Sequence, residues 1–169
     1  MRTLKSRISK EVNNLLNARI KGEYESAYIY YAFANWCNCE GFFDARDKFR
    51  KYGDEELTHA RKLEDYVYDK NGEVELEVIP VFKDSIKSLV DVITKAYEHE
   101  LIVSDNYIKL ANLLSKSDVT TFSFIQWFIN EQIEEEAKFG DVLAFACSHG
   151  ITDSSTGADL HILEEKFVE

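Results

Sequence analysis

Four glutamates interrupt the apolar stripes of this sequence. Apolar residues that recur every three to four positions mark the face of an amphipathic helix that packs into a core. In each of four long segments this face contains one glutamate near its middle, so the pattern directs an acid into the interior. These residues are Glu23, Glu56, Glu100 and Glu135.

Buried carboxylates in this number need a compensating positive charge. Several carboxylates at a similar depth cannot all ionise in a low-dielectric core, because each charge is poorly solvated and repels the others. They can stay protonated or admit water, as in a purely structural polar core, but both solutions cost stability. A multivalent cation removes the conflict directly, so the pattern predicts a metal site inside the fold.

A histidine joins the acid of the second segment. Glu56 and His59 form a Glu-x-x-His pair, which places a carboxylate and an imidazole on one helical face, one turn apart. Four carboxylates and one imidazole suit two hard or borderline ions such as iron better than structural zinc. We expect Glu23, Glu56 and His59 to bind one ion. Glu100 and Glu135 would bind the other ion, with Glu56 as a bridge, and open coordination positions would remain for catalysis.

Four long helices and one short helix must position these side chains. Periodicity and stop signals place them at about residues 7–39, 42–70, 84–114, 119–148 and 158–168. The connections after the first and third helices are short, which makes those neighbours antiparallel. Residues 72–83 contain the only proline and are not helical. Extended, they span about 40 Å, close to the length of a long helix. The sequence therefore predicts an all-α four-helix bundle, two hairpins joined by one long crossover, with a short fifth helix.

Composition agrees with this fold and excludes several function classes. Seven glycines and one proline among 169 residues are too few for the turns of a sandwich or a doubly wound sheet. A net charge of −11 disfavours nucleic acid and anionic membranes as partners, and no apolar run is long enough to span a bilayer. We expect a single domain over residues 1–169, with the bundle at about 4–148.

The cysteines and the first residues predict a reducing, cytoplasmic location. Their number is odd and they lack framework spacing, so we expect free thiols in or near the core. The first residues lack the apolar stretch of a secretory leader. The cysteines are Cys37, Cys39 and Cys147.

In these residues the chain resembles a ferritin of the haem-free bacterial type, over about residues 4–168. The resemblance rests on Glu23 followed by Tyr30 and Trp36, on EELTH at 55–59, on His99-Glu100 and on FIQWFINEQIEEE at 124–136. Symmetric di-iron relatives carry Glu-x-x-His on two helices. Here residues 132–135 read QIEE, so the second imidazole is absent. The only methionine is Met1, so the haem-binding methionine of bacterioferritins has no counterpart.

The resemblance implies a homo-oligomeric shell of 24 chains that stores a ferric mineral. Each bundle would be a ferroxidase that binds two Fe²⁺ ions and oxidises them with O₂ or H₂O₂, and no haem would be bound. The resemblance also implies a third iron position at Glu55, Glu131 and Glu134. A solvated acidic face is the other interpretation of these three residues.

Residues around the centre have more than one interpretation. The resemblance implies that Gln132 hydrogen-bonds a bound water or dioxygen instead of ligating. It also implies that Tyr30, two turns from Glu23, donates an electron or orients a carboxylate, whereas an ordinary core aromatic is the alternative. For the remaining aromatic and histidine residues we expect core packing at Trp36 and Trp127, and surface or interface positions at His99, His149 and His161.

Two other functions compete with the ferroxidase interpretation. A non-catalytic storage or scaffold subunit would resemble ferritin chains that have lost ligands, whereas this chain keeps all five. A di-metal oxygenase acting on an organic substrate is usually larger and carries two Glu-x-x-His motifs.

Two apolar segments predict assembly into a large closed oligomer. Leu160, Leu163 and Phe167 on the fifth helix have no obvious partner in their own bundle. Val74, Leu76 and Val78 alternate as in a strand, and would offer a pairing edge to another copy.

Overall fold

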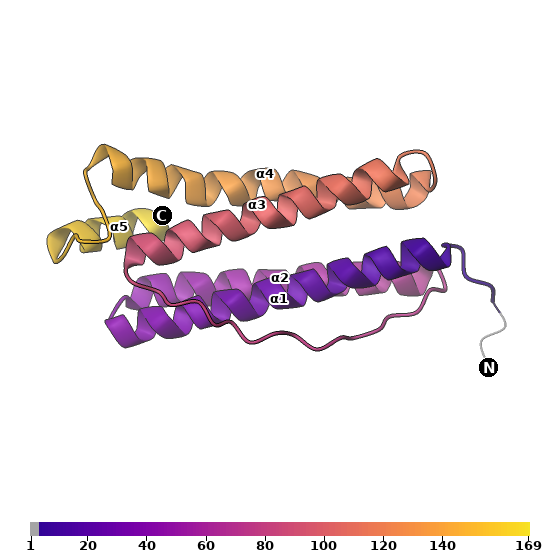
Figure 1. Cartoon of the computed structure of the whole chain (residues 1–169), viewed down its shortest axis with the longest axis horizontal. Coiled ribbons are helices and arrows are strands. Elements are labelled where there is room, and N and C mark those ends of the chain that lie inside the picture. Colours follow the sequence, from indigo (N-terminus) through magenta and orange to yellow (C-terminus); the bar gives the residue numbers. More distant parts are fainter. Residues whose placement is uncertain (1–3) are drawn as a thin grey trace.

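Two antiparallel helical hairpins pack side by side in the structure, a computed structural model that describes residues 4–169 (Figure 1). The first hairpin pairs α1 with α2, the second pairs α3 with α4, and α5 packs against α2 and α4 at one end of the bundle. The helices are α1 (Lys10–Glu40), α2 (Phe43–Asp69), α3 (Leu89–Leu114), α4 (Val119–Ser148) and α5 (Ala158–Val168). Residues 4–169 contain no strand, and the predicted all-α bundle is confirmed. Within the same residues, none of the helices is both long and apolar enough to cross a membrane.

Most helix ends follow their sequence signals. The side chain of Ser9 accepts the Val12 N–H, so α1 begins at Lys10, slightly later than predicted. Gly41, with φ of 89°, ends α1 in the left-handed conformation that glycine adopts without strain. Asp118 caps α4 as predicted.

The third helix begins at Leu89, several residues later than predicted. Oγ of Ser88 accepts the N–H of Asp91 at 2.9 Å, and the Asp91 carboxylate accepts the N–H of Lys87 at 2.8 Å. These two bonds cap the helix from both sides, whereas residues 84–85 offered only a single capping residue. Ile86, which we expected on the helix, therefore lies before it and packs partly buried against the core.

The crossover runs the length of the bundle along the outside of α1, as predicted (Figure 1). Nδ2 of Asn13 donates to the Glu73 carbonyl at 2.9 Å, and Oδ1 of Asn17 accepts the Glu75 N–H at 2.7 Å. Residues 72–88 contain neither helix nor strand. The asparagines of α1 bind the backbone of Glu73 and Glu75 only, and the pairing of Val74, Leu76 and Val78 with another copy stays a prediction.

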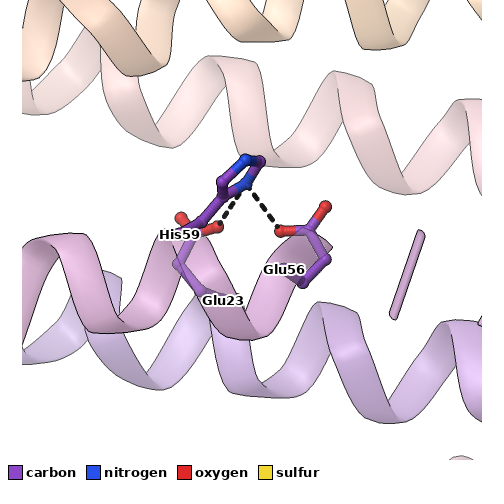
Figure 2. A group of neighbouring side chains, drawn as sticks. All are labelled: Glu23, Glu56 and His59. Carbon is purple, nitrogen blue, oxygen red and sulfur yellow. Dashed lines mark hydrogen bonds and ion pairs between the residues drawn. The ribbon is translucent and has the colours of Figure 1, made fainter. Parts of the chain in front are cut away.

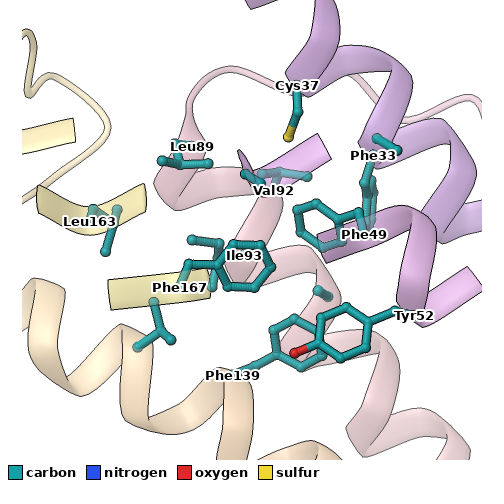
Figure 3. Close-up of a cluster of buried hydrophobic side chains, with 14 of the residues drawn as sticks. Phe33, Cys37, Phe49, Tyr52, Leu89, Val92, Ile93, Phe139, Leu163 and Phe167 are labelled. Atoms are coloured by element: carbon teal, nitrogen blue, oxygen red, sulfur yellow. The ribbon is translucent and has the colours of Figure 1, made fainter. Parts of the chain in front are cut away.

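The hydrophobic core consists of two clusters with a polar belt between them. One cluster lies near α5 and includes Phe49 and Phe139 (Figure 3). The other cluster includes Leu63 and Phe128. Each long helix passes from one cluster to the other. Buried polar side chains fill the middle of the bundle, between the two clusters. They include Glu23, Glu56, His59, Glu100, Gln132 and Glu135.

The fifth helix does have a partner in its own bundle, so the expectation of an uncovered apolar face was wrong. Leu163 and Phe167 are buried in the cluster near α5, and the ring of Phe167 lies 4.8 Å from that of Phe49 (Figure 3). Oε1 of Glu164 accepts the N–H of Ala45 at 3.0 Å. This carboxylate caps the start of α2, which has no side-chain cap of its own.

Only one of the three cysteines lies in the core. Cys37 is buried, and burial raises the pKa of its thiol to about 12. Cys39 and Cys147 are exposed, which corrects the expectation that all three lie in or near the core. All three thiols are free in the structure of residues 4–169.

Candidate metal centre

Three predicted ligands from the first hairpin converge inside the bundle. Glu23 comes from α1, and Glu56 and His59 come from adjacent turns of α2 (Figure 2). Nδ1 of His59 lies 3.2 Å from Oε2 of Glu56 and 3.7 Å from Oε2 of Glu23. All three side chains are buried, and each offers one ligand atom within 4.8 Å of the others. We call this group the first metal position.

Burial and hydrogen bonding act against each other in this group. Burial is the strongest influence on Glu56 and raises its pKa well above the ordinary value, although His59 opposes it. Burial acts the same way on Glu23, but the hydrogen bonds that it receives hold its pKa below the ordinary value. Burial lowers the pKa of His59, but the two carboxylates outweigh it and raise this pKa to about 10. Near neutral pH the metal-free group therefore keeps a proton on His59, which a metal ion must displace.

The second hairpin directs one carboxylate and one amide toward the same level. The hydroxyl of Tyr30 donates to Oε1 of Glu100, and Nε2 of Gln132 donates to Oε2 of Glu100 at 2.7 Å. Burial raises the pKa of Glu100 to about 7, against both of these bonds. Tyr30 and Gln132 thus lie beside the centre, as predicted, and hold both oxygens of Glu100.

Glu135 also lies at this level but is turned to a different partner. Its side chain is buried, and its Oε1 lies 2.8 Å from Nζ of Lys138, one turn further along α4. We call the predicted ligand set of Glu56, Glu100 and Glu135 the second metal position. Glu100 and Glu135 are outside the close group of Figure 2, so the structure assembles the first position more completely than the second.

The three acids of the predicted third iron position lie toward the surface. Glu55 and Glu131 are half-buried, and Glu134 is exposed. Nζ of Lys51 is 3.8 Å from Oε1 of Glu55 in an exposed ion pair. None of the three acids belongs to a close ligand group within residues 4–169, and their binding of iron stays a prediction.

The sequence analysis missed a tyrosine that contacts the first metal position. Tyr107 of α3 is fully buried, and its hydroxyl donates to Oε1 of Glu23. A buried tyrosine hydroxyl usually needs a polar partner. Tyr107 lies in the apolar stripe of its helix, and another helix carries the buried acid Glu23. Together these two features could have indicated the contact.

Two aromatic rings cover the imidazole of the first metal position. The rings of Trp127 and Phe128 meet the His59 ring edge to face, with centroids 5.3 and 6.2 Å away. Trp127 therefore packs against a ligand, which agrees with the expected packing role.

His99, for which we expected a surface or interface position, is directed at a buried side chain of its own bundle. Its Nε2 lies 2.8 Å from Oγ of Ser26, and burial lowers its pKa to about 4. A neutral imidazole therefore sits between α1 and α3, close to the centre but directed at a hydroxyl.

A four-helix bundle with a long crossover, and with buried carboxylates and a histidine where its two hairpins meet, defines a ferritin-like protein with a candidate metal centre. The sequence profile of the family described as a ferritin-like domain matches residues 13–145. The chain belongs to the ferritin family.

Individual relatives agree over most of the chain. It is 37% identical over 138 residues to the bacterial non-heme ferritin of Campylobacter jejuni, covering 80% of this chain and 82% of that one. It is 30% identical over 133 residues to that of Staphylococcus haemolyticus, covering 78% and 80%. Among solved structures, an open pore ferritin from the archaeon Archaeoglobus fulgidus matches with a TM-score of 0.89 at 27% identity, covering 97% of this chain and 98% of that one.

Proposed function

We propose that this protein is an iron-storage ferritin with ferroxidase activity. The observation that supports it most is the buried group of Glu23, Glu56 and His59, opposite Glu100 and Glu135 of the other hairpin. Two carboxylates and one imidazole are donors that iron accepts, and the remaining acids supply a second ion. Iron is the substrate in this proposal, and no haem takes part.

The donor set favours oxidation. Carboxylate oxygens are hard anions that stabilise Fe³⁺ more than Fe²⁺, which lowers the potential of the bound ion. The first Fe²⁺ would displace the proton of His59, and Glu56 would then bridge to the second Fe²⁺. The two ions together give two electrons to O₂, which takes up two protons and becomes H₂O₂. With H₂O₂ as the oxidant, two electrons and two protons give two molecules of water.

Tyr30 and Gln132 position the second ion through Glu100. Their hydrogen bonds hold both Glu100 oxygens in place before a metal arrives. Gln132 would also hydrogen-bond a water or dioxygen bound beside Glu100. We assign Tyr30 a further role as electron donor, because it lies against the carboxylates that hold the iron.

The oxidised iron is stored inside a closed shell, for which the family pattern implies 24 chains. A groove of about 880 Å³ between α1 and the crossover provides a surface for another copy. Tyr28, Leu76 and Pro80 are among the residues that line it, and side chains such as Leu76 are exposed in the single chain. Glu55, Glu131 and Glu134 would receive Fe³⁺ on its way to the cavity, and the protein would work in the cytoplasm.

Oxygen consumption at two Fe²⁺ per chain tests the proposal. We expect about one O₂ consumed per two Fe²⁺, at a rate far above that of free Fe²⁺. Glu135→Ala should remove this rapid phase, whereas Glu98→Ala, which removes an exposed acid of α3, should keep it. Slow mineral growth without a rapid phase in the wild type would indicate a storage-only subunit. Elution as a monomer or dimer, instead of at several hundred kilodaltons, would contradict the shell.

A further inference from the structure

Lys138 is the only basic residue between positions 119 and 148, the whole of α4, and it contacts a carboxylate of the second metal position. Its Nζ lies 2.8 Å from Oε1 of Glu135. The Glu135 side chain is 6% exposed, whereas that of Lys138 is 43% exposed, so the lysine reaches inward from the surface to the buried acid.

The other acids nearby also act on this lysine. Burial works against its charge, yet the pKa of Lys138 is raised, first by the hydrogen bond to Glu135. The charges of Glu55 and Glu131 raise it further. The ammonium group therefore lies among acids assigned to the second and third iron positions, where it partly supplies the positive charge that a metal ion would bring.

A second lysine provides a natural comparison. Nζ of Lys138 and Nζ of Lys48 both lie 5.8 Å from the centre of the Tyr52 ring. Lys48 is directed to the backbone carbonyl of Val168 at 3.4 Å, not to a carboxylate of the centre. The two lysines thus have the same charge and lie at the same distance from Tyr52. Only Lys138 is paired with a predicted metal ligand.

We propose that Lys138 is a tethered cation that competes with iron at the second metal position. In the metal-free protein its ammonium group holds Glu135 away from the first metal position, and an ion at the second position binds only when this contact breaks. Lys138 is thus a positioning residue that acts through Glu135. The inference rests on the proposed function, because it takes Glu135 as a ligand of the second ion.

Competition of this kind weakens the second position without affecting the first directly. Lys138 contacts only one of the two ligands that the second hairpin supplies, and Glu23, Glu56 and His59 are bonded to other groups. A contact between a half-exposed lysine and a buried carboxylate is weaker than a fully buried pair, because solvent screens it. We therefore expect a change of about five-fold in the affinity for the second ion.

Zn²⁺ titration of the assembled, metal-free protein tests this inference without any redox step. The wild type should bind Zn²⁺ in two unequal steps. In Lys138→Gln the second dissociation constant should fall about five-fold and the first should change less than about two-fold. Lys138→Arg keeps the charge and should behave like the wild type. Lys48→Gln removes a matched charge and should leave both constants unchanged.

The possible outcomes separate this inference from the function on which it rests. An unchanged second constant in Lys138→Gln, or an equal effect of Lys48→Gln, would overturn the role of Lys138 and leave the ferroxidase proposal standing. If the wild type bound no Zn²⁺ through Glu56 and His59, both would fail. In a crystal structure with Zn²⁺ at the second position, the distance between Nζ of Lys138 and Oε1 of Glu135 should exceed about 4 Å. A distance unchanged from 2.8 Å would contradict the competition.

Discussion

The hydroxyl of Tyr107 donates a hydrogen bond to Oε1 of Glu23 and so links α3 to the first metal position on the other hairpin. Partners of this kind orient a ligand and support its charge, and their loss typically weakens metal binding about 10- to 100-fold. Tyr107→Phe should therefore lower the affinity of the first position for Zn²⁺ about ten-fold in calorimetric titration. Tyr24→Phe, which removes a hydroxyl bonded at 2.8 Å to Glu64, is the control and should have no effect. A change of less than two-fold in Tyr107→Phe would show that Glu23 needs no such support.

The two metal positions should fill in a fixed order. The first has an imidazole and two carboxylates already within 4.8 Å of one another, whereas the second lacks an imidazole and shares Glu56. Affinity follows the number and type of donors, so the first position should be the stronger one. In crystals soaked with less than one Zn²⁺ per chain, anomalous scattering should appear first at His59. Equal occupancy of both positions would mean that the ligands are divided differently between the ions.

Metal binding at the first position should release protons and strengthen with pH. The pKa of His59 is raised to about 10 by the two carboxylates, so this imidazole holds a proton at neutral pH that an ion must displace. Each proton displaced raises the apparent affinity about ten-fold per pH unit, up to the pKa of the group. Zn²⁺ calorimetry in two buffers of different ionisation enthalpy, between pH 6 and 8, should detect this release. Identical heats in both buffers would contradict the assigned protonation.

Replacing Glu100 by an uncharged residue should stabilise the metal-free protein at neutral and alkaline pH but not at acidic pH. Burial raises its pKa from 4.5 to about 7 in the folded chain, so ionisation penalises folding progressively between these values and fully above pH 7. Glu100→Gln removes this penalty and should raise the free energy of unfolding at pH 8 by on the order of 2 kcal/mol. Little gain should appear below pH 4.5, where the carboxyl is protonated in both states. Urea unfolding of the metal-free protein at pH 8 and pH 4 makes the comparison, and an equal gain at both would point to packing instead of charge.

Helical periodicity was sufficient to place the buried acids. Glu23, Glu56, Glu100 and Glu135 all lie in the belt between the two hydrophobic clusters. A helical face is a local property of the sequence, and a polar residue inside it must face the core whenever the helix packs. The long crossover was predictable for a similar reason, because only a chain of that reach can join two hairpins end to end. Whether these residues bind iron as assigned stays a prediction.

Contacts between distant segments were not predictable in the same way. Glu164 caps α2 from the far end of the chain, and nothing near either residue in the sequence indicates that they meet. The docking of Leu163 and the bond between His99 and Ser26 likewise depend on how helices are rotated against each other. The contact between Lys138 and Glu135 is local by contrast, because a lysine three positions after a glutamate lies on the same helical face.

The crossover that separates the hairpins also sets an order of events for a newly made chain. Each hairpin is built from contacts close in sequence, which form quickly, whereas docking of one hairpin on the other requires the long tether to be drawn in. All ligands of the first metal position lie on the hairpin that is synthesised first, and Glu100 and Glu135 lie on the second. In the proposed function, a reactive pair of ions can therefore form only after the second hairpin has docked. Oxidant is consumed, and any peroxide released, only after the core has closed around the iron.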